Sequence, residues 1–282
     1  MNRRYREARK GWLLILPLMI GCMVFYAISF GMVLQYSVTQ GDGGMSNYRA
    51  LLENRIFRLA FWNTIRFLLA GLPLIMLLAY AVALALKKYT QKYNSLKTVL
   101  MLPYVMPVVG TVVLVKFLFA QYGIVNRGLY ALGLPVADWL SSDKAFYIFL
   151  ALYLWKNTGY TVILLLSGLV TIPEDHYAAA SLDGASALQQ FRCITVPQMW
   201  RPVFFAVVFS LINAFKSFRE IFLIGGTHPN SSVYMLQHFI NNNFENLNYG
   251  RLSAASVLLF LILTAAFALF YHWVNRKEAY RE

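Results

Sequence analysis

Charged residues are scarce in this chain of 282 residues. They make up 13% of the sequence, about half the share found in soluble globular proteins. Apolar and aromatic residues make up 59%, and the mean hydropathy is +0.54. A soluble domain of this length does not bury so much apolar surface, so the composition excludes most soluble enzymes and any disordered chain. Lipid is therefore the expected solvent for part of the chain.

The common catalytic and nucleotide-binding motifs are also missing. No Gly-Lys dipeptide occurs, which excludes the G-x-x-x-x-G-K-[ST] loop that cradles nucleotide phosphates. The four histidines form no H-E-x-x-H pair, and G-x-S-x-G is absent. Cysteine is limited to Cys22 and Cys193, which form no disulfide or metal-binding pattern. We expect a non-catalytic chain without a cofactor or metal of its own.

Six apolar stretches are long enough to cross the hydrocarbon core, which takes about 20 residues of helix. They predict an all-α polytopic membrane protein with six transmembrane helices, at residues 12–36, 61–86, 99–119, 145–170, 202–224 and 253–274. Residues 1–11 and 275–282 are then polar tails around a permease domain of residues 12–274. Pro73, Pro103 and Pro107 predict kinks or breaks in the second and third helices.

Basic residues are unevenly distributed between the loops. The two tails and the loops after the second and fourth helices hold 14 of the 25 Lys and Arg, whereas the other loops hold six. The positive-inside rule places the richer segments, and therefore both termini, in the cytoplasm. This distribution also accounts for the formal net charge of +13 without any nucleic-acid partner.

Ionisable residues inside the predicted helices are costly and mark candidate pathway residues. Lys216 and Glu220 are four residues apart, so they are expected to share a helix face, where they can pair. Aromatic faces beside amide and charged donors suit a sugar. The candidate substrate pathway comprises Tyr153, Trp155, Lys156, Asn157, Tyr160, Asn213, Lys216, Arg219 and Glu220. A structural ion cluster is the alternative interpretation of Lys216, Arg219 and Glu220.

The cytoplasmic loop at residues 171–201 contains signals for a short helix. Pro173 precedes Glu174 and Asp175, whose negative charge in a first turn offsets the helix dipole. Three alanines follow, and Gly184 ends the helix or turns the chain. Small side chains permit close docking into a groove on a partner. These local features are equally compatible with a surface helix that docks nothing.

This loop resembles the E-A-A motif of ABC-importer permeases, E-A-A-x-x-x-G followed after about nine residues by I-x-L-P. Ala179 and Ala180 match the alanines, Gly184 the glycine, and Ile194 and Pro197 the end of the motif. Ala178 stands where the motif has Glu, and Val196 where it has Leu. Leu102-Pro103-Tyr104, Tyr122-Gly123-Ile124-Val125-Asn126 and Asp138-Trp139-Leu140 are also similar to family segments. The combination resembles the MalF/UgpA-like carbohydrate branch of the binding-protein-dependent, MetI-like permeases.

The resemblance implies a transmembrane subunit of an ATP-driven importer in a bacterial plasma membrane. Its partners would be a second homologous permease, two ATP-binding subunits that hold ATP and Mg, an extracytoplasmic solute-binding protein and membrane lipid. Residues 177–187 would form the coupling helix, and 225–243 would lie outside. The residues implied to contact the ATPase are Tyr177, Ala178, Ala179, Ala180, Asp183, Gly184, Ala185, Ile194 and Pro197.

The implied cargo is a sugar or oligosaccharide delivered by the binding protein. Two alternatives remain open. The same machinery could import an acidic saccharide or a glycerophosphodiester, since Lys156, Lys216 and Arg219 are cationic. A stand-alone secondary transporter is the other alternative, and it would need carboxylates inside the membrane, of which Glu220 is the only candidate.

Overall fold

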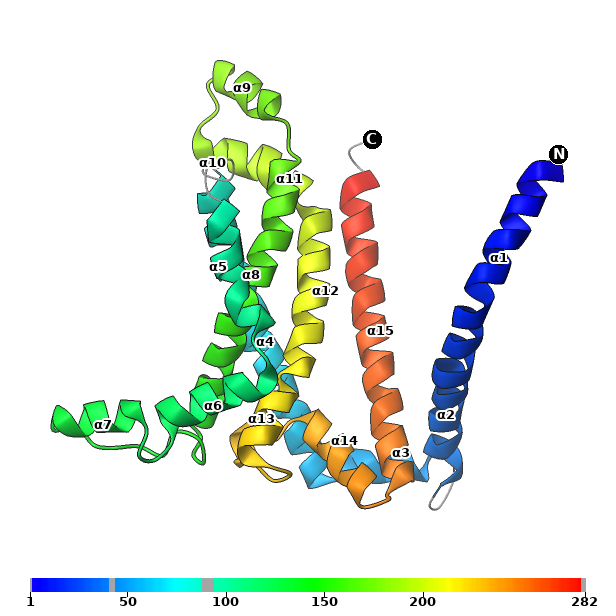
Figure 1. Ribbon diagram of the computed structural model, residues 1–282, viewed down its shortest axis with the longest axis vertical. Helices are drawn as coiled ribbons and strands as arrows, with labels where there is room; N and C mark the ends of the chain where they lie inside the picture. Colours follow the sequence, from blue (N-terminus) through cyan, green and yellow to red (C-terminus); the bar gives the residue numbers. More distant parts are fainter. Residues whose placement is uncertain (1, 41–43, 88–93, 280–282) are drawn as a thin grey trace. The chain divides into compact units, whose positions relative to one another are not determined.

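The computed structural model describes residues 2–40, 44–87 and 94–279, and every regular element in these ranges is helical (Figure 1). The chain divides into two compact units. One comprises Met1–Arg58 and Ile240–Ala265, and the other Leu59–Phe239 and Ala266–Glu282. The predicted all-α class is confirmed.

The first unit begins with a continuous helical segment made of α1 (Asn2–Cys22), a π-helical stretch (Met23–Ile28) and α2 (Ser29–Thr39). The short helix α3 (Ser46–Glu53) is tied to its end by Asn47, whose side-chain amide donates to the carbonyl of Ser37 at 3.1 Å. Most apolar side chains of α1 are exposed, Leu14 to 83%. Such a surface is stable in lipid and not in water.

The second unit is built around α8 (Ala145–Val170), which packs against both α5 (Asn94–Val105) and α12 (Trp200–Lys216) (Figure 1). The long helix α4 (Arg55–Lys87) contributes to two apolar clusters. In one, the ring of Phe67 makes edge contacts with Phe146 and Tyr153 of α8. In the other, the small residues Ala79 and Ala83 are fully buried against residues of α8, where their size permits close helix packing.

Two of the predicted transmembrane helices are interrupted. The third is α5 followed by α6 (Val108–Phe119), and Pro107 lies at the break, as its missing N–H favours. The fifth is α12 followed by α13 (Phe218–Gly225), with the break at Ser217. Helices α6 and α13 pack on each other, so the two breaks occur side by side. Pro73 and Pro103, by contrast, lie inside unbroken helices.

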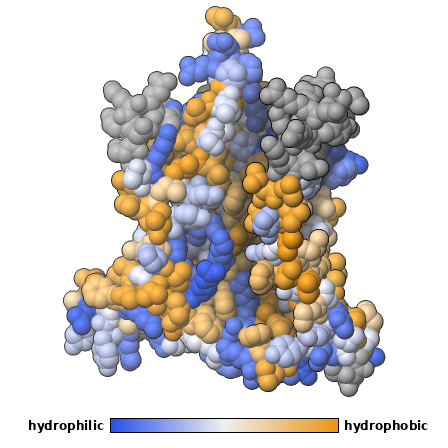
Figure 2. All heavy atoms as spheres, turned by 45° about the vertical axis from the view of Figure 1, so that its right-hand side comes forward, coloured by the Kyte–Doolittle hydropathy of each residue, from blue (hydrophilic) through white to orange (hydrophobic). Residues whose placement is uncertain are grey.

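Five helical segments of the described chain are long and apolar enough to cross a membrane. They are Gly11–Thr39, Arg55–Lys87, Val108–Ala131, Ala145–Val170 and Tyr249–Val274, the last within α15 (Tyr249–Ala279). The predicted fifth helix is not among them because the break at Ser217 shortens α12, so the count of six stays a prediction. In Figure 2, hydrophobic side chains cover much of the visible face, and hydrophilic ones lie toward its upper and lower ends and in a band near its middle.

A hydrogen-bonded turn follows α7 (Ile124–Ala131). The buried side chain of Asn126 donates to the carbonyl of Ala137 at 2.9 Å and accepts from the indole N–H of Trp139 at 2.9 Å. Asn126 is the last residue of the family-like Tyr122–Asn126 segment, and this geometry gives it a structural role.

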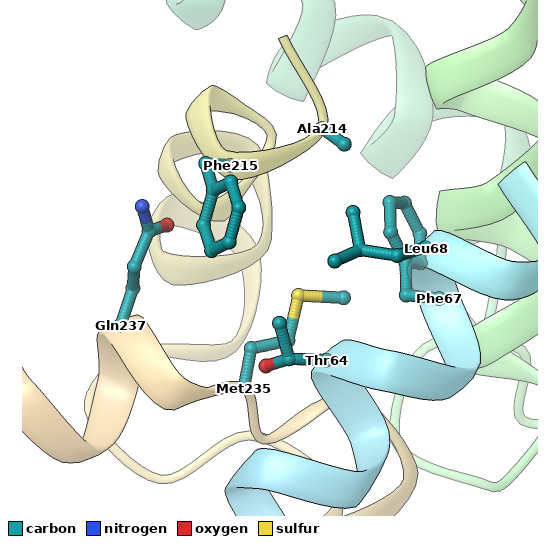
Figure 3. A pocket seen from close by; sticks show the side chains of 7 residues that line it. All are labelled: Thr64, Phe67, Leu68, Ala214, Phe215, Met235 and Gln237. Atoms are coloured by element: carbon teal, nitrogen blue, oxygen red, sulfur yellow. The ribbon is translucent and has the colours of Figure 1, made fainter. Parts of the chain in front are cut away.

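The segment between α13 and α14 (Leu236–Glu245), which contains a 3-10 turn (Ser231–Val233), is fastened to α4. Thr64 accepts from the amide of Leu236 at 2.9 Å, beside a small apolar pocket into which Met235 points (Figure 3). His238 is fully buried, and its Nδ1 accepts from the amide of Met235 at 3.2 Å. Burial, and secondarily the nearby His228, lowers the pKa of His238 to about 4.

Candidate functional site

The loop at residues 171–201 forms a helical projection at one end of the second unit (Figure 1). Its first helix is α9 (Glu174–Leu182), with Glu174 and Asp175 in the first turn as predicted. The family resemblance implied bounds of 177–187. The helix begins three residues earlier, as the local signals after Pro173 predict, and it ends before Gly184, which corrects the implied bounds. The physical reason is that Pro173 starts the helix and Gly184 terminates it.

Gly184 ends α9 through a Schellman motif. Its φ is +77°, in the left-handed region that glycine tolerates best. The amide of Gly184 donates to the carbonyl of Ser181, and the amide of Ala185 to that of Ala180 at 2.9 Å. Ser186 then caps the next helix, α10 (Ala187–Gln190), in a capping box with Gln189. Because both turns are fully hydrogen-bonded, the projection has one defined shape.

Two of the residues that the resemblance assigns to ATPase contact are partly buried and pack on this chain's own core. Tyr177 and Ile194 pack on the apolar cluster that contains Leu165 and Met199. The hydroxyl of Tyr177 hydrogen-bonds Thr195 at 2.8 Å, and the ammonium of Lys87 lies 4.1 Å from the Tyr177 ring centre. These contacts anchor α9 to the helices behind it.

The exposed surface of the projection includes several small and apolar residues. Ala178, Ala179, Asp183 and Gly184 are exposed, and Ala180, Ala185 and Pro197 are half-buried. Leu182 is 90% exposed at the end of α9, and its side chain is absent from both core clusters. The sequence reasoning did not select Leu182. The signal was available, since an apolar residue directly before a predicted helix end in an exposed loop has no core to enter.

A second candidate site is a cavity of about 280 Å³ at the two helix breaks of the second unit. Six of the predicted pathway residues line it, namely Lys156, Asn157, Asn213, Lys216, Arg219 and Glu220. The remaining lining residues are Tyr104, Met106, Pro107, Val108 and Ser217. Interrupted helices place polar backbone groups at such a site, which membrane proteins tolerate only where the backbone lines a cavity or is buried in protein.

Glu220 forms its ion pair with Lys156 of α8, at 2.5 Å from Nζ to Oε1, and not with Lys216 as the i,i+4 spacing predicts. The spacing argument fails because Lys216 ends α12 and Glu220 lies in α13, on the far side of the break at Ser217. Both paired side chains are largely buried, at 14% and 7% exposure, whereas Lys216 and Arg219 are exposed.

The other predicted pathway residues are divided between the cavity wall and the core. Tyr153 is buried and donates to the carbonyl of Ser210 at 2.9 Å, while Trp155 is 45% exposed and does not line the cavity. Tyr160 stacks on Tyr104 with ring centres 4.5 Å apart. Tyr104 is the pathway candidate that the sequence reasoning missed, because 56 residues separate it from Tyr160.

The described residues are all helical where they are regular, with several helices apolar and long enough to cross a membrane, broken helices around a polar cavity and a projecting helical loop. This combination is typical of a membrane transport permease. Residues 71–280 match the family described as binding-protein-dependent transport system inner membrane component. The chain belongs to that family, which consists of transport permeases and not of catalytic subunits. This confirms the resemblance drawn from the loop at residues 171–201.

The sequence similarity to known relatives covers most of the chain. The trehalose/maltose transport system permease protein MalF of Thermococcus litoralis is 30% identical over 97% of this chain and 96% of its own length. The sn-glycerol-3-phosphate transport system permease protein UgpA of Yersinia pestis is 27% identical over 96% and 95%. The sulfoquinovosyl glycerol transport system permease protein SmoG of Agrobacterium fabrum is 28% identical over 83% and 77%.

The fold has a solved counterpart. A chain in the crystal structure of a bacterial ABC transporter involved in the import of the acidic polysaccharide alginate matches with a TM-score of 0.81, over 98% of this chain and 99% of that one. The identity is 20%, so this likeness concerns the fold.

Proposed function

We propose that this chain is the permease subunit of an ATP-driven importer of a sugar or oligosaccharide, delivered by an extracytoplasmic solute-binding protein. ATP and Mg act in two partner subunits, and a second homologous permease completes the translocation path. The relatives transport saccharides or a glycerol ester, which supports this class of cargo. The membrane is a bacterial plasma membrane, and the chain crosses it with both termini in the cytoplasm.

The observation that carries the proposal is the α9 projection. It is anchored on its inner side by Tyr177 and rigidified by the caps at Gly184 and Ser186, yet its outer side covers nothing within the described chain. A rigid helix with alanines and an exposed leucine on its free side matches the helix-in-groove mode of docking. The partner's groove belongs to the ATPase, as the family resemblance implies.

The proposed orientation draws support from the end of α15. Trp273 makes an edge contact with Trp200, the first residue of α12 after the projection, with ring centres 4.7 Å apart. The C-terminal end of α15 is therefore on the same side of the second unit as α9. If α9 meets a cytoplasmic ATPase, the C-terminus is cytoplasmic as well, in agreement with the distribution of Lys and Arg.

The stand-alone transporter is disfavoured by the state of Glu220. A proton relay inside the membrane requires carboxylates or histidines that exchange protons with the path. Glu220 is instead held by Lys156 at 2.5 Å. No second carboxylate lines the cavity in the described part of the chain.

The first test is purification of the chain from membranes in mild detergent, followed by mass spectrometry of the co-purifying subunits. We expect a second permease and an ATPase with a phosphate-binding loop. Recovery of the chain alone or as a homodimer, without any ATPase, would refute the proposal.

The second test concerns Leu182. Leu182→Glu introduces a charge at a position that is 90% exposed and belongs to neither core cluster of the described residues, so folding should be unaffected. Loss of one buried leucine contact of about 1.5–3 kcal/mol lowers ATPase association by about tenfold or more. Leu132→Glu is the matched control, since Leu132 is 76% exposed and lies directly after α7. Equal recovery of the ATPase with both variants would exclude α9 as its docking helix.

A further inference from the structure

The cavity at the helix breaks has an unbalanced charge. Its lining contains three cationic side chains, those of Lys156, Lys216 and Arg219, and one carboxylate, that of Glu220. The carboxylate is fully engaged by Lys156 at 2.5 Å. Lys216 and Arg219 have no ion-pair partner among the described residues and are exposed on the cavity wall. The cavity therefore presents two uncompensated positive charges.

Cations at membrane depth are unfavourable when they face lipid, and in membrane proteins they lie against water-filled paths or opposite charges. The positive charges of Lys216 and Arg219 do not serve to balance Glu220, because Glu220 of α13 is already paired with Lys156 of α8. A buried pair of this kind holds the two helices in register, whereas Lys216 and Arg219 remain available to a ligand. The chemistry that satisfies them is a carboxylate, sulfonate or phosphate.

The cavity also contains a fixed aromatic face. Tyr104 lines it and is stacked on Tyr160 at 4.5 Å with nearly parallel rings, and Tyr160 in turn contacts Phe209 edge to face at 5.9 Å. A ring held in this way offers a flat surface at small conformational cost. The volume of about 280 Å³ is near the lower end of small-ligand sites, which start at about 300 Å³, and suits one sugar unit at a time.

We propose that this cavity selects anionic saccharides, with Lys216 and Arg219 binding the acidic group and Tyr104 supporting the sugar ring. The proposal rests on the proposed import function and narrows its cargo to acidic sugars. Lys156 and Glu220 position α8 against α13 and do not bind the cargo.

The test is direct binding to the complex, purified with its partner subunits into nanodiscs and without the binding protein. The probes are trigalacturonate, which carries three carboxylates, and the neutral trisaccharide maltotriose. We expect trigalacturonate to bind about tenfold more tightly or better, and added salt to weaken its binding alone. Absence of trigalacturonate binding, or equal affinity for the two probes, would overturn the proposal.

Charge-removing variants locate the site. Lys216→Gln and Arg219→Gln should each weaken trigalacturonate binding about tenfold, the effect of losing one charge-assisted hydrogen bond, and leave maltotriose binding unchanged. Lys116→Gln is the matched control, because Lys116 is an exposed cation of α6 that does not line the cavity. If Lys216→Gln lowers recovery of the partner permease without changing trigalacturonate binding, the cation serves assembly and the proposal is wrong.

The same preparation separates this proposal from the import function. Co-purification of an ATPase together with absent trigalacturonate binding overturns only the acidic cargo. Absence of the ATPase overturns the import function itself, and the cargo proposal with it.

Discussion

A close backbone approach between α8 and α5 predicts that one added methyl group has a large effect on stability. A Cβ added at Gly159 of α8 would lie 1.7 Å from the carbonyl oxygen of Leu100 in α5, whereas real Cβ contacts are essentially never under 3.0 Å. Gly159→Ala therefore displaces α5 from α8 by about 1.3 Å. Both atoms belong to helix backbones, so no side-chain rotation relieves the clash.

The free energy of unfolding should fall by about 3 kcal/mol, the upper end of the usual cost of overpacking. At about 2–4 °C per kcal/mol, the midpoint of thermal unfolding falls by about 6–12 °C. Transport should fall as well, because the displaced α5 ends at Val105 and carries Tyr104 into the cavity wall. The assay is thermal unfolding of the purified complex, with transport measured below the lowered midpoint.

Gly128→Ala is the matched control with the opposite sign. Gly128 lies in α7, and nothing lies within 4 Å of a Cβ built there. Alanine in a helix interior is about 0.5–1 kcal/mol more favourable than glycine, so the midpoint should rise slightly. A Gly159→Ala protein as stable as the native one would refute the close packing of α5 on α8.

Three further predictions concern other sites. Gly184→Val should lower the free energy of unfolding by about 1–2 kcal/mol, because φ is +77° at this position, and should uncouple ATP hydrolysis from transport. Gly184→Asn should retain coupling, because Asn tolerates this conformation. If the two variants transport the same amount of substrate per ATP hydrolysed, the helix cap at Gly184 has no role in coupling. Lys156→Met leaves the Glu220 charge buried without its partner and should lower the free energy of unfolding by about 3–5 kcal/mol. Adding Glu220→Gln to that variant should recover at least about 1 kcal/mol. If thermal unfolding shows that the effects of the two substitutions simply add, the ion pair does not contribute to stability. Because the pKa of His238 is lowered from 6.5 to about 4, unfolding takes up a proton once the pH falls below 6.5, and about 2 kcal/mol of stability present above that pH is lost by pH 5. In His238→Gln, the free energy of unfolding, measured by thermal unfolding at pH 6.5 and pH 5, should no longer show this loss.

The features predicted correctly from the sequence depend on short-range physics. Apolar stretches of about 20 residues select lipid and helix whatever their neighbours are. The start of α9 after Pro173 and its end at Gly184 follow from capping within a few residues, so the projection was identifiable in advance. The break at Pro107 follows from a missing N–H. These properties require no knowledge of which helices touch.

Which side chains pair with one another could be established only from the tertiary structure. Glu220 pairs with Lys156 because a break at Ser217 separates it from Lys216 and because α13 crosses near α8, and no local pattern contains either fact. Tyr177 and Leu182 share one short helix, yet packing against a distant cluster makes one an anchor and leaves the other exposed. The sequence by itself determined that lipid is the solvent, which segments are helical and how the helices are capped. Each of these depends on free energies of residues close together in the chain. The cavity and its surplus charge were decided by helix packing, which depends on residues far apart in the chain.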